Sequence, residues 1–266
     1  VELRKAAVEM TGIKFDRLRL YYVNHNHKIG LQMFQIIPFI PPKEFIIEDS
    51  GPQFSYMVND LFEYIPPIII WISLLFWYKT PLTEYIQMST VMWVMHFAKR
   101  SFEAVFVHTY SRKTLPIFSA IDNSCFKNCM YYWLFSFAIS ISIMRNPYYL
   151  ATDFSFLQPI GLFLWIISEL LNGYAHLRLR ALRPKGSLDH FLPTGFLFDS
   201  ITSPNYTFEI LAWLSFSFYT QRSICYSFTL LGCIQMLIWA DQKRRGLATR
   251  YPEVLRRGRV SPFTWF

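Results

Sequence analysis

Six apolar runs, most of them close to the length of a bilayer, constrain this chain more than any other feature. A helix needs roughly 20 consecutive apolar residues to span the hydrocarbon core. Hydrophobic residues make up 53% of the 266 residues and charged residues 17%, which excludes both a soluble globule and a disordered chain. We therefore predict an all-α polytopic membrane protein with about six transmembrane helices. The six runs are Leu61–Trp77, Tyr85–Val107, Met130–Met144, Phe154–Ala175, Tyr206–Tyr219 and Ser223–Ala240.

Basic residues are distributed unevenly among the segments that join these runs. With a cytosolic N-terminus, the cytosolic segments hold 21 of the 26 Lys and Arg residues, and the opposite side holds three. Lys99 and Arg100 lie within a span. Cytoplasmic loops carry the positive excess in membrane proteins. The net charge of +8 therefore indicates topology rather than nucleic-acid binding, and both termini are expected to face the cytosol.

Residues 1–48 differ in character from the rest of the chain. They are charged and begin with a helical pattern, which is followed by a strand-like segment at Arg19–Val23 and a turn at Asn24–Lys28. This pattern predicts a small α+β cytosolic domain. The membrane domain is expected to occupy residues 49–266.

The sequence motifs of soluble nucleotide-binding and hydrolytic enzymes are missing. There is no G-x-G-x-x-G, P-loop, G-x-S-x-G or H-E-x-x-H pattern, and the ten glycines are scattered. The four cysteines have neither a Cys-x-x-Cys pair nor the spacing of a zinc site, so we expect reduced thiols and no metal site. A nucleotide would have to be held by side chains between helices.

Polar residues in two segments are candidates for a substrate site. Gln53 leads into Glu63, which precedes Pro66 and Pro67, where we expect the helix to be broken. Glu63 has either a structural role at this break or a functional one.

The second segment runs from His96 to His108. Lys99 and Glu103 are spaced i,i+4 on a helix, and Arg100 and Glu103 are spaced i,i+3. Two interpretations stay open. The charges form a self-neutralising set of ion pairs, or they bind anionic thioester or phosphate groups.

The third segment carries the most polar groups within apolar surroundings. Asn172, His176, Arg180 and Arg183 are spaced i, i+4, i+8 and i+11, so they form one stripe along a helix. Donors that end in arginines suit a dinucleotide, because guanidinium binds phosphate in a bidentate manner. A role as the cytosolic end of a span would explain the arginines but not Asn172 or His176.

Asn205 and Glu209 lie one helical turn apart in the next run, at a spacing that suits a single amide or ribose group. Ionisable groups inside a membrane cost free energy, and those that are kept there are usually functional. The sequence therefore predicts a ligand site between the fourth and fifth runs.

Several stretches together resemble one known family. They are GPQ followed by Glu63-Tyr64, then HFAKRSFEAVFVHTYS with LPIF, FKNCMYYW, NGYAHLRLRALRP and TSPNYTFEILAW. These stretches resemble the very-long-chain trans-2-enoyl-CoA reductases, a branch of the steroid 5-alpha-reductase family. Residues 1–48 resemble the ubiquitin-like N-terminal domain of that branch, which is expected to be incomplete here.

The resemblance implies an endoplasmic reticulum membrane enzyme that uses NADPH. Its expected reaction is the last step of the very-long-chain fatty-acid elongation cycle, the reduction of a long-chain trans-2-enoyl-CoA to a saturated acyl-CoA. Components of the fatty-acid elongase are possible partners. By resemblance, Asn172, Arg183, Asn205 and Glu209 match cofactor-binding positions, Tyr206 matches the proton donor, and functionally important positions of the substrate half are matched by Gln53, Glu63, Lys99 and Arg100. From the helical stripe we also expect His176 and Arg180 to bind the cofactor. Among the substrate-half residues, we expect Glu63 and Lys99 to be catalytic and Gln53 and Arg100 to bind the substrate.

Two alternatives to this function stay open from the sequence. One is an enone reductase that acts on 3-oxo-steroids. The resemblance argues against it, because Phe97 stands where steroid-reducing relatives have a tyrosine. The other is a catalytically silent homologue that acts as a membrane partner. The C-terminal tail favours this silent homologue, since Arg244 and Leu247 stand where the family has His and Tyr.

Overall fold

The computed structural model describes residues 2–14, 17–24, 27–30, 45–110, 114–117, 124–148, 156–182 and 191–261. The chain forms two compact units. The N-terminal unit comprises Val1–Asn59 with Arg112–Lys127, and the helical unit comprises Asp60–Ser111 with Asn128–Phe266.

The N-terminal unit contains a helix and two small antiparallel sheets. Strand β1 lies between β2 and β3 in the first sheet, and β4 pairs with β5 in the second. Ala7, Leu18 and Leu20 form a small core. The helix and the strand predicted before residue 24 are confirmed by α1 and β1, whereas a ubiquitin-like fold stays a prediction. The elements are α1 (Glu2–Thr11), β1 (Leu18–Asn24), β2 (His27–Gly30), β3 (Phe45–Asp49), β4 (Gln53–Ser55) and β5 (Thr114–Pro116).

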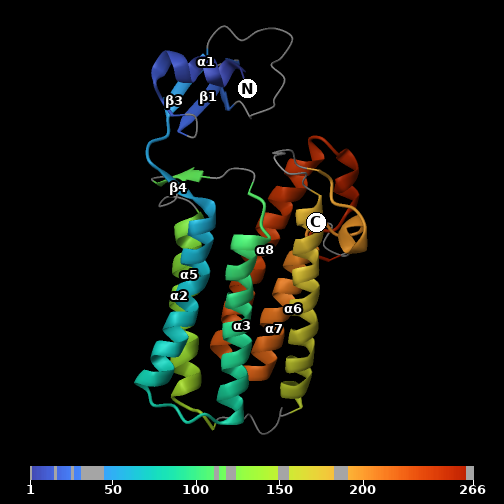
Figure 1. Ribbon diagram of the computed structural model, residues 1–266. Helices are drawn as coiled ribbons and strands as arrows, with labels where there is room; N and C mark the ends of the chain where they lie inside the picture. The colour runs from blue at the N-terminus through green and yellow to red at the C-terminus, as the bar shows by residue number, and fades with distance from the viewer. Residues whose placement is uncertain are drawn as a thin grey trace. The chain divides into compact units, whose positions relative to one another are not determined.

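Long helices that run side by side make up the helical unit (Figure 1). Each of the six predicted apolar runs corresponds to one helix. The long helices are α2 (Tyr56–Trp77), α3 (Glu84–Phe106), α5 (Ser124–Met144), α6 (Leu157–Ala181), α7 (Pro204–Thr220) and α8 (Ser223–Ala248), and two short 3₁₀ helices are η2 (Phe196–Asp199) and η3 (Pro252–Arg256).

Three of the described helices, α2, α6 and α8, are long and apolar enough to cross a membrane. Helix α7 has only 17 residues, and α3 carries Lys99, Arg100 and Glu103. Large apolar side chains point outward from the helices, including Phe76, Phe163 and Leu230, which are 76%, 63% and 61% exposed. Exposed apolar surface of this extent indicates contact with lipid. The chain is therefore a membrane protein.

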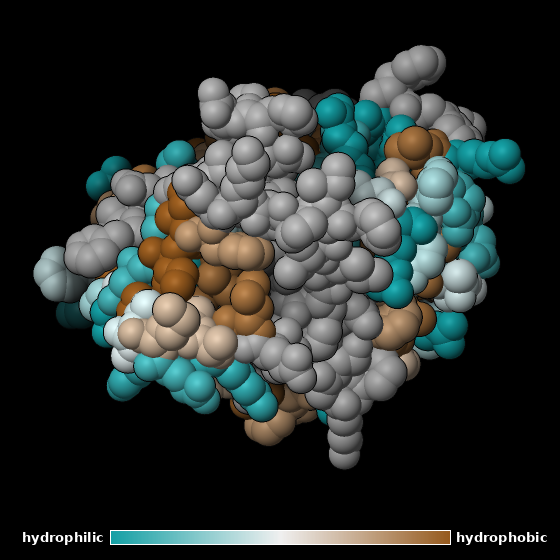
Figure 2. All heavy atoms as spheres, turned by 90° about the horizontal axis from the view of Figure 1, so that it is seen from above, coloured by the Kyte–Doolittle hydropathy of each residue, from teal (hydrophilic) through white to brown (hydrophobic). Residues whose placement is uncertain are grey.

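The described residues that are visible in Figure 2 are mixed in hydropathy. Seen from above, hydrophobic and hydrophilic patches of the described residues lie next to one another (Figure 2). Such mixing is usual for a surface in water, where apolar atoms still contribute more than half of the accessible area.

The predicted break at Pro66 and Pro67 is wrong, because α2 continues through both prolines. Proline lacks the N–H that would bond the carbonyl four residues earlier. For Pro66 that carbonyl belongs to Phe62, and it accepts a hydrogen bond from the indole N–H of Trp133 at 3.0 Å instead. A neighbouring helix thus satisfies the backbone group that proline leaves free, as membrane helices require. Glu63 consequently lies inside a continuous helix.

Aromatic rings fill the core of the helical unit. The Trp93 ring lies 5.1 Å from Trp71, 5.0 Å from Phe97 and 5.5 Å from both Trp213 and Phe216, measured between centroids. These residues come from α2, α3 and α7. Aromatic pairs in tilted or edge-to-face arrangements add about 0.5–1.5 kcal/mol beyond the burial of their area. This layer fixes the spacing of the helices beneath the charged site.

Helices α6 and α7 pack closely at Gly161. A Cβ atom added there would lie 2.7 Å from the Ser215 carbonyl oxygen and 2.8 Å from the Tyr219 nitrogen, both backbone atoms of α7. Small residues permit such close approach between membrane helices.

Gly161→Ala is therefore expected to destabilise the protein by about 1–3 kcal/mol, because the two backbones must separate. Gly246→Ala in α8 is the matched control, since a Cβ there meets nothing within 4 Å. It should be neutral or stabilising by up to about 1 kcal/mol. Thermal unfolding in detergent measures both effects, and equal stability of the two variants would contradict the close packing.

Candidate functional site

Ionisable groups gather between α2, α3, α6 and α7 in the helical unit. Among the described residues the cluster holds four carboxylates, two permanent cations and two imidazoles. Its members are Glu63, Glu103, Glu169, Glu209, Lys99, Arg100, His96 and His176. All except Lys99 and Arg100 are buried. Groups of this kind in an apolar bundle must be paired with one another.

His96 joins two of the carboxylates. Its Nδ1 lies 2.6 Å from Glu169 Oε1, and its Nε2 lies 3.2 Å from Glu209 Oε1. A carboxylate accepts hydrogen bonds, so both contacts are made only when both ring nitrogens carry a proton. The ring also packs against Trp213, with centroids 4.2 Å apart. His96 thus ties α3 to α6 and α7 and places one positive charge between two negative ones.

Lys99 and Asn172 continue this network. Lys99 Nζ donates to Glu169 Oε2 and to Asn172 Oδ1, each at 2.6 Å. Asn172 Nδ2 donates to the Asn205 carbonyl oxygen at 2.9 Å and to Glu209 Oε2 at 3.0 Å. The amide of Asn172 is therefore oriented by a cation on one side and by the first turn of α7 on the other.

Arg100 lies at the centre of a second group. Its NH1 donates to Glu103 Oε2 at 2.7 Å and lies 3.2 Å from His176 Nδ1, and its NH2 donates to the Tyr64 hydroxyl at 2.9 Å. His176 Nδ1 in turn lies 2.8 Å from Glu103 Oε2. The predicted i,i+3 pair of Arg100 and Glu103 is confirmed. The i,i+4 pair is looser, since Lys99 lies 3.9 Å from Glu103 and makes its short contacts elsewhere.

Glu63 and Tyr206 lie beside these groups. Tyr206 is close enough to Arg100, Glu209 and Glu63 to interact electrostatically with all three. Its hydroxyl makes no hydrogen bond with a described residue, and its ring lies 6.2 Å from that of Trp239. Tyr206 therefore offers a phenol that is hydrogen-bonded to none of the described residues.

The structure brings most of the predicted site residues together. They form two adjoining groups, one with Lys99, Asn172, Asn205 and Glu209 and one with Arg100 and His176, which the 3.9 Å pair of Lys99 and Glu103 links. Glu63 and Tyr206 lie beside them. Arg180 is exposed in the last turn of α6. Arg183 lies outside the described residues. Gln53 belongs to the N-terminal unit, where its side chain bonds the Gly51 carbonyl at 2.9 Å.

Two members of the network, His96 and Glu169, were not predicted as site residues. A signal was present for each. His96 lies three residues before Lys99, and Glu169 lies three residues before Asn172, so each shares a helix face with a predicted residue.

The C-terminal tail is hydrogen-bonded to the segment that leads into α7. The Gly258 N–H donates to the Ser200 carbonyl at 2.9 Å, and the N–H groups of Thr202 and Ser203 donate to carbonyls of the tail at 2.8 and 3.0 Å. Buried Arg257 donates to the Pro193 and Phe198 carbonyls at 2.6 and 2.8 Å. The tail thus holds the entry to α7, two residues before Asn205.

These features define a membrane protein with a charged site buried between its helices. A family model described as 3-oxo-5-alpha-steroid 4-dehydrogenase matches residues 113–264. The very-long-chain enoyl-CoA reductase of Dictyostelium discoideum is 36% identical over 216 residues, which cover 77% of this chain and 70% of that protein.

Two further relatives carry similar names. A Caenorhabditis elegans protein named "Probable very-long-chain enoyl-CoA reductase" is 31% identical and aligns with 78% of this chain and 70% of its own length. The human "Trans-2,3-enoyl-CoA reductase-like" protein is 26% identical over a region that covers 81% of this chain and 62% of that protein. The chain belongs to the 3-oxo-5-alpha-steroid 4-dehydrogenase family, in the branch of the enoyl-CoA reductases.

Proposed function

We propose that the protein reduces the 2,3 double bond of a long-chain trans-2-enoyl-CoA to the saturated acyl-CoA, with NADPH as the reductant. Similarity to proteins named very-long-chain enoyl-CoA reductase supports the reaction and its substrate class. The observation that carries the proposal is the network around Asn172, which joins α3, α6 and α7 at a buried site.

The residues present fit a nicotinamide nucleotide. Asn205 Oδ1 is buried and has no hydrogen-bond partner among the described residues. A buried acceptor without a donor is rare in folded proteins. The carboxamide or a ribose hydroxyl of the cofactor would supply that donor, and Asn172 holds the neighbouring backbone of Asn205 in place. Arginines at the cytosolic end of α6 suit the phosphates.

Each part of the network has a defined task in this proposal. The cofactor supplies a hydride to C3 of the enoyl group. Tyr206 donates a proton to C2, because its hydroxyl makes no hydrogen bond with a described residue and lies near the buried charges. Asn172, Asn205 and Glu209 position the cofactor. His96 holds Glu209, and Lys99, which is bound by Glu169, holds Asn172.

The cations of α3 are already paired. Lys99 contacts Glu169, and Arg100 contacts Glu103, so the structure supports the self-neutralising alternative for their charges. Nevertheless, Arg100 Nε is buried without a partner among the described residues. We propose that this N–H faces the substrate side of the site, where Arg100, Lys99 and Glu63 contribute to binding and polarising the thioester. For Gln53, a role in substrate binding is proposed from the family resemblance alone.

The cellular setting of the proposal follows from the family resemblance and the charge pattern. We propose that six helices span the endoplasmic reticulum membrane, that both termini are cytosolic, and that residues 1–48 form a ubiquitin-like domain. The reaction is then the last step of very-long-chain fatty-acid elongation, next to elongase components.

A steroid substrate is tested by comparing turnover of an enoyl-CoA with that of a 3-oxo-4-ene steroid. Faster turnover of the steroid would contradict the assignment.

The unmodified protein is expected to prefer NADPH over NADH, because guanidinium groups near the cytosolic end of α6 suit a 2′-phosphate. Arg183→Ala should raise the concentration of NADPH needed for half-maximal rate more than that of NADH. Arg145→Ala is the comparison, since Arg145 is exposed, follows the end of α5 and lies outside this stripe of arginines. Initial rates at varied cofactor concentration measure the half-maximal concentrations of NADPH and NADH. Equal use of both cofactors by the unmodified protein would exclude recognition of the 2′-phosphate.

The topology predicts that a tag fused after Phe266 is removed when sealed microsomes are treated with protease, because the C-terminus is expected to be cytosolic. A tag inserted after Arg145 should be protected until detergent is added. Protection of the C-terminal tag in sealed microsomes would overturn the six-span arrangement.

A further inference from the structure

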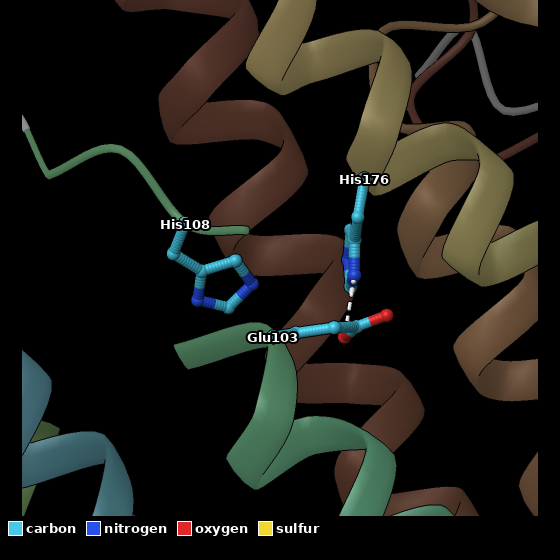
Figure 3. A group of neighbouring side chains, drawn as sticks. All are labelled: Glu103, His108 and His176. Carbon is cyan, nitrogen blue, oxygen red and sulfur yellow. Dashed lines mark hydrogen bonds and ion pairs between the residues drawn. The ribbon is translucent and has the colours of Figure 1, made fainter. Parts of the chain in front are cut away.

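Glu103, His108 and His176 bring three metal-ligating side chains together at the edge of the site. One ligand atom from each lies within 4.8 Å of the others. Figure 3 shows His176 pointing from its helix toward Glu103, while one ring nitrogen of His108 faces the same space. The residues are far apart in the sequence and have no zinc-site spacing, so the sequence did not predict a metal site there.

The three side chains come close to the geometry of a metal centre. Zinc binds nitrogen and carboxylate oxygen at about 2.0–2.2 Å, which places tetrahedral ligand atoms about 3.3 Å apart. Glu103 Oε2 and His176 Nδ1 are 2.8 Å apart, and the whole set lies within 4.8 Å. Small side-chain rotations therefore suffice to coordinate an ion. Glu103 and His176 are buried, and His108 is partly exposed, which leaves a route for an ion to enter.

A second carboxylate lies beside His108. Its Nδ1 is 3.6 Å from Asp60 Oδ2, within ion-pair range but longer than a hydrogen bond. A small rotation of the ring would let Nδ1–H donate to Asp60 and leave Nε2 for an ion. Tyr110 donates to the same Asp60 oxygen at 2.6 Å. Ligating histidines commonly have a carboxylate on the other ring nitrogen, which fixes the ring and strengthens the ligand.

We infer that Glu103, His108 and His176 form a binding site for a divalent transition ion, with Zn²⁺ as the best match. Two imidazoles and one carboxylate are a known zinc donor set with a fourth position open. Imidazole ligands favour Zn²⁺, Cu²⁺ or Ni²⁺ over Mg²⁺ and Ca²⁺.

The ion and Arg100 compete for the same atoms. Arg100 NH1 contacts Glu103 Oε2 at 2.7 Å and His176 Nδ1 at 3.2 Å, so an ion that is coordinated through these two atoms displaces Arg100 NH1 from them. Arg100 retains its bond to the Tyr64 hydroxyl. The ion therefore draws Glu103 and His176 away from the proposed substrate and cofactor groups, and bound Zn²⁺ inhibits the enzyme. This consequence, unlike the binding itself, depends on the proposed function.

Metal binding is tested on the full chain, purified in detergent without a histidine tag and freed of metal by a chelator. Titration with Co²⁺, followed by its visible absorption and then by displacement with Zn²⁺, should show one bound ion. His108→Gln should abolish binding. Asp60→Asn should weaken it by about 10–100-fold, because it removes the orienting carboxylate.

His27→Gln is the matched control, because this histidine lies in β2 of the N-terminal unit, and it should bind as the unmodified protein does. If the unmodified protein binds no ion, or if His108→Gln binds it equally well, the site is disproved. Zn²⁺ should also inhibit NADPH oxidation by the unmodified protein and not by His108→Gln. A further outcome is that His108→Gln loses metal binding but Zn²⁺ does not inhibit the unmodified protein. This outcome would support the metal site and disprove its competition with Arg100.

Discussion

Tyr206→Phe is expected to lower the rate of enoyl-CoA reduction by about a hundredfold to ten-thousandfold, the usual effect of losing a general acid. The substitution removes only the hydroxyl, which makes no hydrogen bond with a described residue, and it keeps the ring beside Trp239. NADPH binding and thermal stability should therefore stay unchanged. Turnover, cofactor binding and unfolding temperature are measured on the same preparation.

Tyr174→Phe provides the matched control for loss of a phenol. Tyr174 lies on α6 and is 46% exposed, so its hydroxyl has no part in the proposed chemistry. Its turnover should equal that of the unmodified protein. A Tyr206→Phe enzyme with near-normal turnover would exclude Tyr206 as the essential acid and leave it the role of an aromatic anchor near the helix end.

His96→Leu is expected to destabilise the protein by on the order of 3 kcal/mol, because removing one partner of a buried ion pair leaves the other partner uncompensated. Here two carboxylates lose their shared donor, although Lys99 still contacts Glu169 and Asn172 still contacts Glu209. NADPH binding should weaken as well, since Glu209 loses its contact with His96 and keeps only that with Asn172 among those described. Chemical or thermal unfolding in detergent and a cofactor titration measure the two effects.

His96→Gln distinguishes the lost hydrogen bonds from lost packing. The amide donates to one of the two carboxylates, so this variant should be destabilised less than His96→Leu. If His96→Leu is as stable as the unmodified protein, the bridge between Glu169 and Glu209 does not contribute as described.

The sequence predicted local features of the fold well. Apolar runs located the six long helices, and helical spacing predicted the Arg100–Glu103 pair, because both depend on neighbours along one helix. The predicted break at Pro66 failed for a different reason. Whether a proline interrupts a membrane helix depends on a partner for the freed carbonyl, and that partner, Trp133, comes from a distant part of the chain.

The site, too, was predicted only where its residues share one helix or one apolar run. Asn172, Asn205 and Glu209 were recognised because they are polar groups in apolar runs. His96 joins Glu169 on α6 to Glu209 on α7, an arrangement that depends on how three helices approach one another. Glu103, His108 and His176 likewise meet only in the folded protein. The spacing of residues within a single helix does not predict contacts between residues of different segments.

Oxidation of NADPH by the purified protein, with a long-chain trans-2-enoyl-CoA in detergent, tests the central claim most directly. NADPH absorbance should fall only when the enoyl-CoA is present, and one saturated acyl-CoA should form for each NADPH consumed. Asn172→Asp is the informative variant, since it replaces the donor to Asn205 and Glu209 with a carboxylate, and it should abolish the reaction. Bound NADPH without acyl-CoA product, or product formation that Asn172→Asp leaves unchanged, would contradict the proposed site and its reaction.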